Sequence, residues 1–400
     1  MRRAMLLGLA LAMIVAWWQP GGAAAAPEIS TQAQAAALID VTSGRLLYSK
    51  QGDKQMLIAS LTKIMTAIVA IEHGNLSDKV KVGKNAFGKE GSSIYLKLGE
   101  EMKLSDMLYG MMLRSGNDAA TAIAEHIGGS EAGFAYMMNE KARLIGMERT
   151  QFQNPTGLNQ DGHYSTANDM AKLVAYAMQN PTFREIVKTQ MKTAPNPNEK
   201  WDYQWKNKNK MLTLYEGADG VKTGYTKLAK RCLASSATRD GRQLAVITLN
   251  DSDDWNDHQR LLDYGFKYFP LEKLIGKGDP VDLPGSADAD GTKLQAAAGA
   301  TLRYPFAAGE ASGVTSRVLP TDPNSAAYRL GDLGALEYYL EGRKIGSVPL
   351  YMKNDPRLLE PDRSAFGAQA LRLGTSMWSR LSEAVQLTLR AMFEFSPTGR

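Results

Sequence analysis

Ser60 and Lys63 stand three positions apart at the start of an apolar stretch. The apolar run after Lys63 and the glycine at position 74 predict a buried helix that begins at Ser60. Side chains at this spacing lie one turn apart on the same face of a helix. A lysine whose pKa is lowered by burial or by nearby cations can take the proton of a serine hydroxyl. The pair therefore predicts covalent catalysis, with the free N–H groups at the helix start stabilising negative charge.

This spacing alone carries little weight, because serine is a common helix cap and lysine is a common helical residue. A second motif strengthens it: Ser115, Gly116 and Asn117 separate two predicted helices, 104–113 and 119–127. A break of this kind presents a short hydroxyl and an amide to a cleft. The same residue types are ordinary turn formers, so a plain helix–helix turn is the competing interpretation.

A third motif, Lys222-Thr223-Gly224, lies at a predicted strand. Glycine lets another backbone approach closely, threonine offers a hydroxyl, and lysine offers a cation. The competing interpretation is a surface patch on an edge strand. Average residue usage gives this tripeptide in only about one chain in ten of this length.

Each motif occurs once, in the order Ser-x-x-Lys, Ser-x-Asn, Lys-Thr-Gly. That order is the signature of the penicillin-binding proteins and serine β-lactamases. The wider sequence resembles the low-molecular-mass, serine-type D-alanyl-D-alanine carboxypeptidases of peptidase family S11. The similarity covers about residues 36–270, and the segments that carry it are 59–66, 113–120, 154–158, 164–170 and 220–226. Segments 205–210, 226–231 and 250–255 are similar to the sporulation-type members of that family.

The resemblance implies an α/β (α+β) fold, a penicillin-binding-protein/serine β-lactamase-like transpeptidase domain. It implies removal of the terminal D-alanine from peptidoglycan stem pentapeptides through a Ser60 acyl-enzyme, which limits cross-linking. It also implies that β-lactam antibiotics bind covalently as inhibitors. In this scheme Ser60 attacks the carbonyl between two D-alanines and Lys63 takes its proton. Ser115 and Asn117 relay a proton to the leaving amine and orient the substrate amide.

The resemblance assigns a second group of residues to substrate binding. Lys222 and Thr223 would hold the terminal carboxylate of the peptide. Gly224 would lie beside the substrate, and the backbone N–H groups of Tyr225 and Ser60 would form the oxyanion hole. Which lysine or hydroxyl acts as the general base stays open at this point.

Three other functions compete. A class A β-lactamase uses a glutamate near a Leu-Asn element for deacylation, and the nearest match, 157–159, is preceded by Thr156. A peptidoglycan D,D-endopeptidase shares the superfamily, but the predicted additional β domain and terminal helix favour the carboxypeptidase. A non-catalytic envelope-binding protein is disfavoured because all three motifs are intact.

The predicted elements describe how the motifs are held. Strands are expected from both ends of residues 27–270 and helices from the middle, which predicts one sheet built from distant segments. Asp240-Gly241 predicts a hairpin between strands 231–238 and 243–249, and Thr166 and Asp169 predict a helix start. The other expected strands are 37–40, 46–48, 80–82 and 94–96, and the other expected helices are 130–145, 166–178 and 253–269.

From residue 271 onwards helical periodicity gives way to short apolar runs with more glycine and proline. Runs at 302–304, 314–319, 336–340 and 344–350 predict a small β-rich domain over 271–358. It carries no cluster of chemical interest, so a structural or spacer role is expected.

The two ends predict export and attachment. Residues 1–26 combine Met1-Arg2-Arg3, an apolar region and a run of alanines, as in a cleaved signal peptide. Residues 359–400 contain a predicted amphipathic helix, 364–395, with interspersed arginines. This helix predicts peripheral attachment to the outer face of the bacterial cytoplasmic membrane; a helix packed on the β domain is the alternative.

Composition excludes several classes of function. The net charge of +5 is spread along the chain without a basic tract, so nucleic acid is not an expected partner. The four histidines are scattered without ligand spacing, so neither a metal site nor a cofactor is expected. The single cysteine, Cys232, cannot form an intrachain disulfide, and its apolar surroundings predict a buried, inert thiol.

Overall fold

Strands from both ends of the larger domain form one five-stranded sheet in the order β2-β1-β9-β8-β7. The computed structural model describes residues 26–287 and 293–362. All four pairings in this sheet are antiparallel, and β1 lies between its neighbour β2 and the distant β9. The bounds are β1 (Ala35–Asp40), β2 (Leu46–Lys50), β7 (Ala218–Thr226), β8 (Lys230–Arg239) and β9 (Arg242–Leu249). The predicted sheet of distant segments and its α/β character are confirmed.

The β8–β9 hairpin turns at Asp240 and Gly241, where both residues have positive φ angles of 49° and 74°. This backbone is the one that Asp-Gly favours in two-residue turns. Arg239 and Arg242 face each other as the last pair of the ladder. The predicted hairpin is therefore confirmed, with each strand slightly longer than expected.

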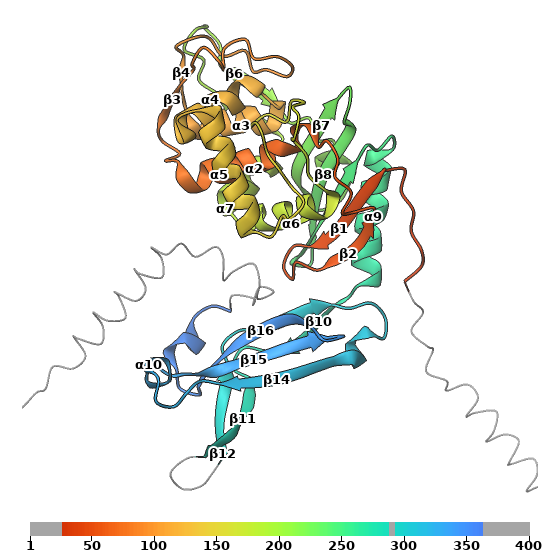
Figure 1. Ribbon diagram of the computed structural model, residues 1–400, viewed down its shortest axis with the longest axis vertical. Helices are drawn as coiled ribbons and strands as arrows, with labels where there is room; N and C mark the ends of the chain where they lie inside the picture. Colours follow the sequence, from red (N-terminus) through yellow and green to blue (C-terminus); the bar gives the residue numbers. More distant parts are fainter. Residues whose placement is uncertain (1–25, 288–292, 363–400) are drawn as a thin grey trace, which may run out of the picture.

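Helices cover both faces of the sheet (Figure 1). Alternate residues of β1 and β9 belong to two different hydrophobic clusters, one on each face, as the two-residue period of a strand requires. On one side lie α2 (Thr62–His73), α3 (Leu104–Arg114), α4 (Asn117–Gly128), α5 (Glu131–Leu144), α6 (Ala167–Ala177) and α7 (Pro181–Lys188). On the other side α9 (Asp254–Tyr268) packs on β9 and β8. With both faces covered, all six residues of β1 are buried.

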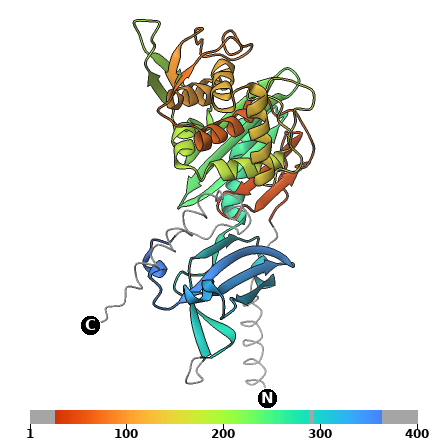
Figure 2. The ribbon, with the colours of Figure 1, turned by 60° about the vertical axis from the view of Figure 1, so that its left-hand side comes forward.

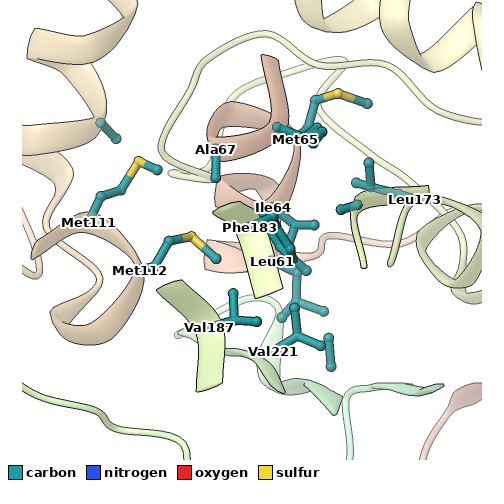
Figure 3. Close-up of a cluster of buried hydrophobic side chains, with 14 of the residues drawn as sticks. Leu61, Ile64, Met65, Ala67, Met111, Met112, Leu173, Phe183, Val187 and Val221 are labelled. Atoms are coloured by element: carbon teal, nitrogen blue, oxygen red, sulfur yellow. The ribbon is translucent and has the colours of Figure 1, made fainter. Parts of the chain in front are cut away.

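Helix α2 lies in the middle of the larger cluster. Every residue from Thr62 to Ala70 is buried. Figure 3 shows the apolar side chains around it, which come from α3, α6, α7 and β7: Met111, Met112, Leu173, Phe183, Val187 and Val221. Because the helix is buried on all sides, its first turn, which carries Thr62 and Lys63, is held in a fixed position.

Some local predictions are wrong. Residues 94–96 are not a strand, because the N–H groups of Ile94 and Leu96 donate to the Asp118 carboxylate instead of to a neighbouring strand. The strand that pairs with β3 (Lys79–Lys81) is β4 (Glu101–Lys103). The polar passage after α6 contains α7, the hairpin β5 (Met191–Ala194) and β6 (Tyr203–Lys206), and the short α8 (Met211–Leu214).

The smaller domain is built of β-strands around its own hydrophobic cluster. Its main sheet has the order β11-β12-β16-β15-β14, and β10 pairs with β13 beside it. The bounds are β10 (Leu271–Ile275), β11 (Pro280–Ala287), β12 (Lys293–Ala298), β13 (Leu302–Pro305), β14 (Val314–Pro320), β15 (Asp332–Leu340) and β16 (Arg343–Met352), with α10 (Ala326–Arg329) between β14 and β15. The predicted runs at 302–304, 314–319, 336–340 and 344–350 all fall in these strands.

Figure 2 shows the larger domain above the smaller one. Arg45, in the turn between β1 and β2, connects the two. Its guanidinium donates to the carbonyl oxygen of Pro305 and to Oε1 of Glu310 at 2.7 Å. It also lies over the rings of Phe269 and Tyr304, with distances of 5.7 and 5.2 Å to the ring centroids. The bond from Arg45 lowers the pKa of Glu310 below its ordinary value.

The predicted signal peptide falls almost wholly in residues 1–25, and the predicted amphipathic helix falls in 363–400, outside the described residues. Among residues 26–287 and 293–362, no helix has the length and apolar character needed to cross a bilayer.

Candidate active site

Ser60 lies in a 3₁₀ turn, Ala59–Leu61, and α2 proper begins at Thr62. The prediction that the helix begins at Ser60 is therefore wrong by this one turn. Ala59 has a φ of 46°, which turns the chain sharply into the helix. Ser60 is partly exposed while Ala59 and Leu61 are buried. The hydroxyl thus reaches solvent from a rigid support.

Lys63 is fully buried, and its Nζ has three neighbouring oxygens. Nζ lies 3.2 Å from Oγ of Ser60, 2.6 Å from Oδ1 of Asn117 and 2.6 Å from the carbonyl oxygen of Thr156. Burial, and then the positive charge of Lys222, hold the pKa of Lys63 well below its ordinary value. A neutral amine has two N–H donors and one lone pair. The two short contacts use both donors, so the lone pair is left for the Ser60 hydroxyl.

Asn117 is fixed at the first position of α4, directly after the break that ends α3. Its amide Nδ2 donates to the carbonyl oxygen of Glu90 at 2.6 Å, while Oδ1 accepts from Lys63. Ser115, at the break itself, is buried and has a left-handed φ of 67°. The break therefore brings Asn117 into direct contact with Lys63 and places Ser115 two residues away.

Lys222 lies on β7 and is 2% exposed. Its Nζ donates to the carbonyl oxygen of Thr223 at 2.7 Å. Burial, and then the positive charge of Lys208, lower the pKa of Lys222 to about 7. This lysine is therefore close to the midpoint of its titration at neutral pH.

The end of β7 passes directly beside Ser60. A Cβ on Gly224 would lie 3.2 Å from the backbone nitrogen of Ser60, tighter than an ordinary contact. Thr223 and Gly224 are partly exposed, and the Tyr225 side chain is 64% exposed. Opposite Gly224 in the ladder is Cys232, which is buried, and burial raises its pKa to about 12. The predicted burial of the thiol is confirmed, and the groups that face solvent here are those of β7.

Sequence reasoning missed the part that Lys208 takes in this site. Its backbone N–H donates to the carbonyl oxygen of Leu113, and its Nζ donates to Oγ of Ser92 at 3.4 Å. Burial, and then the charge of Arg114, lower the pKa of Lys208. Lys208 in turn lowers the pKa values of Lys63 and Lys222. The segment 205–210 carries part of the family resemblance, but nothing in its spacing places it near the other motifs.

The loop that supplies the Thr156 carbonyl was also missed. Oδ1 of Asn154 accepts from the N–H groups of Thr156 and Gly157 and so holds the turn. Gly157 has a φ of 81°, and a Cβ there would lie 1.9 Å from the carbonyl oxygen of Ala59. Only glycine fits this approach, which brings the loop against the Ser60 turn.

His163 supports the same turn from behind. Its Nδ1 accepts from the N–H of Gln153 at 3.1 Å, so Nε2 carries the proton in the neutral ring. Nε2 is 2.9 Å from Oγ1 of Thr62, which itself donates to the carbonyl oxygen of Ala59 at 2.9 Å. Burial lowers the pKa of His163 to about 4, so this chain of bonds persists at neutral pH.

The arrangement can perform nucleophilic acyl transfer. It offers a partly exposed hydroxyl, a buried amine of lowered pKa 3.2 Å from that hydroxyl, and a second lysine on the adjoining strand. Within residues 26–287 and 293–362, no group of three or more histidine, cysteine, aspartate or glutamate side chains is placed to hold a metal ion.

Comparison with known proteins gives a consistent result. The family profile described as D-alanyl-D-alanine carboxypeptidase, Peptidase S11, matches residues 22–253. The carboxypeptidase DacF of Bacillus subtilis is 37% identical over 262 residues, which cover 64% of this chain and 67% of the relative. The carboxypeptidase DacC of Escherichia coli is 29% identical over 338 residues, which cover 80% of this chain and 83% of the relative.

Solved structures agree. Penicillin binding protein 5 from Haemophilus influenzae is 27% identical with a TM-score of 0.67, covering 82% of this chain and 98% of the other. The D-alanyl-D-alanine carboxypeptidase DacD from Francisella tularensis is 26% identical with a TM-score of 0.65, covering 84% of this chain and 97% of the other. Both matches cover more of the chain than the larger domain alone.

Proposed function

Because the chain belongs to the D-alanyl-D-alanine carboxypeptidase family, Peptidase S11, we propose that Ser60 is its nucleophile and Lys63 its general base. The protein is a low-molecular-mass penicillin-binding protein with serine-type D-alanyl-D-alanine carboxypeptidase activity. The contact that carries the assignment is the one between Nζ of Lys63 and Oγ of Ser60, 3.2 Å. In neutral Lys63 both N–H groups are used by Asn117 and Thr156, which leaves the amine free to accept the serine proton.

Acylation follows from this geometry. Oγ of Ser60 attacks the carbonyl carbon of the penultimate D-alanine, and its proton passes to Nζ of Lys63. The oxyanion forms beside the backbone N–H groups of Ser60 and Tyr225. As the C–N bond breaks, the proton moves to the leaving amine of the terminal D-alanine, with Ser115 on its route. Water then attacks the ester, and the same lysine accepts and returns a proton.

Lys222 and Thr223 supply recognition of the peptide end. A free carboxylate beside Lys222 raises the pKa of that lysine from about 7 and holds it protonated. The resulting pair is charge-assisted, and the Thr223 hydroxyl offers a further donor. A nearby protonated lysine also keeps Lys63 neutral. Substrate binding and base activation therefore support each other.

The β-lactam antibiotics are the covalent inhibitors expected of this site, since their ring amide takes the place of the D-alanyl-D-alanine amide. The two other enzymatic candidates, a D,D-endopeptidase and a β-lactamase, share the nucleophile. They differ in what is released and in how fast the acyl-enzyme is hydrolysed. Recognition of a free carboxylate by Lys222 favours the carboxypeptidase.

The decisive experiment measures free D-alanine released from diacetyl-Lys-D-Ala-D-Ala by the wild type, Ser60→Ala and the exposed control Ser316→Ala. The wild type and the control should release D-alanine, and Ser60→Ala should release none. Intact-protein mass spectrometry after penicillin treatment should show one adduct on the first two proteins. An adduct that persists on Ser60→Ala removes Ser60 from the role of nucleophile.

We propose that the protein acts in the cell envelope, because its peptidoglycan substrate lies there. We propose residues 1–26 as a cleaved signal peptide, 27–270 as the catalytic domain, 271–358 as a spacer and 359–400 as a peripheral anchor on the outer face of the cytoplasmic membrane. The composition of the two terminal segments supports the first and last of these. Membership of the sporulation-type subgroup stays a prediction.

A further inference from the structure

A pocket of about 1010 Å³ lies where the two domains meet, away from Ser60. The β8–β9 turn, the C-terminal part of α9 and the start of β10 form most of its wall, and Arg303 of β13 completes it. Arg239 is seven residues along β8 from Cys232, the partner of Gly224. At about 3.3 Å per strand residue this places the pocket roughly 23 Å from the active site.

Four cationic side chains and two carboxylates line this junction pocket. The cations are Arg239, Arg242, Lys267 and Arg303, and the carboxylates are Asp240 and Asp263. One cation and one carboxylate neutralise each other, since Nη1 of Arg239 lies 3.3 Å from Oδ1 of Asp263. The same oxygen of Asp263 also accepts from the Tyr215 hydroxyl at 2.6 Å.

Arg242 is the most deeply placed of the four, with 7% of its surface exposed. Its Nε donates to Oδ2 of Asp40 at 2.9 Å, and its Nη1 donates to the carbonyl oxygens of Phe269 and Gly265. Its Nη2 is buried and finds no hydrogen-bond partner among the described residues. A buried donor without a partner costs roughly 1–3 kcal/mol, but this nitrogen has almost no accessible surface and so offers no donor to a ligand in the pocket.

Lys267 and Arg303 are exposed, and neither forms an ion pair with any carboxylate in the described part of the chain. They belong to different domains, α9 and β13. Arg303 also stands directly opposite Lys273 in the β10–β13 ladder. Like charges at such a pair repel each other. The charge of Lys273 therefore adds to the positive potential around Arg303. Within the pocket lining the single carboxylate left over is Asp240, which does not balance them; Asp362, whose pKa the charge of Arg303 helps to lower, is not part of the lining.

We propose that the junction pocket binds the phosphate group of a phosphate monoester or diester. A phosphate group offers several strong acceptor oxygens, so Lys267 and Arg303 can both donate charge-assisted hydrogen bonds to it. The volume exceeds that of inorganic phosphate, so the pocket has room for the group that carries it. Because its ligands come from both domains, the bound phosphate would also hold the two domains together.

The test uses the full chain and a charge-matched pair of variants. The double variant Lys267→Gln/Arg303→Gln removes one lysine from α9 and one arginine from β13. The control Lys103→Gln/Arg329→Gln removes the same charges at exposed positions, one in each domain, outside the pocket. Isothermal titration with sn-glycerol 3-phosphate should give binding to the wild type and the control. The dissociation constant of the pocket variant should be at least about tenfold higher.

The same ligand should raise the melting temperature of the wild type and the control but not of the pocket variant. D-alanine release should be equal in all three proteins, which separates this site from the catalytic one. Sedimentation with phosphatidylglycerol or phosphatidylcholine vesicles distinguishes the source of the phosphate. If the pocket variant binds anionic vesicles more weakly than the control and both bind phosphatidylcholine vesicles equally, the phosphate belongs to a lipid headgroup. If both proteins bind the anionic vesicles equally, the ligand is a soluble phosphate ester. Equal affinities of the pocket variant and the control for glycerol phosphate, or no heat with the wild type, overturn the proposal.

Discussion

Asn117 accepts a hydrogen bond from Lys63 at 2.6 Å, a shorter contact than the 3.2 Å between Lys63 and Ser60. The asparagine therefore decides where the amine points before any substrate arrives. Its amide oxygen is neutral, so it favours the ammonium form of Lys63 less than a carboxylate at this position would.

Asn117→Asp should move the pH dependence of penicillin acylation to higher pH. The new carboxylate raises the pKa of Lys63, so the neutral form that accepts the Ser60 proton appears only at higher pH. Rates of adduct formation measured by mass spectrometry from pH 6 to 10 report this shift. The exposed control Asn324→Asp should keep the wild-type profile. A variant that loses rate equally at every pH would show that Asn117 acts through structure and leaves the Lys63 pKa alone.

Lys222→Gln should lower kcat/KM for the D-alanyl-D-alanine peptide by about 2–4 kcal/mol of transition-state stabilisation, because a charge-assisted bond to the carboxylate is lost. The wild type should turn over the C-terminally amidated peptide poorly. Steady-state release of D-alanine or D-alanine amide measures both effects. Equal turnover of acid and amide by the wild type would mean that no carboxylate is read, and an endopeptidase would then fit better.

Lys222→Met should make the folded protein more stable at pH 7. The pKa of Lys222 is lowered in the folded state to about 7 from 10.5, so the unfolded chain binds more protons between these two values. The free energy of unfolding of the wild type therefore rises with pH through this window. The cost of burying Lys222 is fully present below pH 7. The gain from the substitution should be on the order of 2–4 kcal/mol at pH 7 and should shrink towards pH 10. Urea unfolding at both pH values measures the gain, with the exposed Lys81→Met as control. Equal changes in the free energy of unfolding for the two variants would contradict the prediction.

Arg45→Ala should loosen the contact between the domains. It removes the bonds to Pro305 and Glu310 and the stacking on Phe269 and Tyr304. The loss should be about 1–3 kcal/mol, as for hydrogen bonds to charged groups. Calorimetry should show a lower melting temperature or two resolved transitions, and limited proteolysis should cut near residue 270. Arg329→Ala, on the exposed side of the smaller domain, is the control. An unchanged melting profile of Arg45→Ala would mean that the junction does not depend on Arg45.

Deletion of residues 364–400 should leave D-alanine release from small peptides unchanged and abolish sedimentation with anionic vesicles. Burying the arginines of this segment in hydrocarbon would cost roughly 2.5–3.5 kcal/mol each, so a position in the interface is favoured over a span. Trp378→Ser with Phe393→Ser in the full chain should weaken the same binding. If the shortened protein unfolds, or the full chain ignores vesicles, the segment has a structural role.

The sequence was sufficient to identify the three motifs and to predict most strands and turns of the sheet, because these depend on local signals. Asp240-Gly241 determines its own turn, and Thr166 accepts from the N–H of Asp169 as the predicted helix start requires. The three motifs are short, and their order is characteristic of one superfamily. Alternating apolar residues located β15 and β16 equally well.

What the sequence did not disclose depends on contacts between distant segments. The Thr156 carbonyl is a backbone group, and it reaches Lys63 only because Gly157 lets two loops touch. The position of Lys208 depends on a bond to Leu113, nearly a hundred residues earlier. Residues 94–96 have strand-like composition, but Asp118 takes their N–H groups. A tertiary partner decided each of these cases, and no local pattern encodes it.

The pairing of β1 with β9 also constrains when the protein can fold. Ala35 faces Leu249 and Asp40 faces Leu244, so the central ladder joins the first strand to one made much later. A chain emerging residue by residue cannot complete this sheet until most of the larger domain has been synthesised. Until then β1 has only β2 beside it, and a lone hairpin is marginal in water. The topology therefore delays completion of the central sheet until the chain has been made as far as β9.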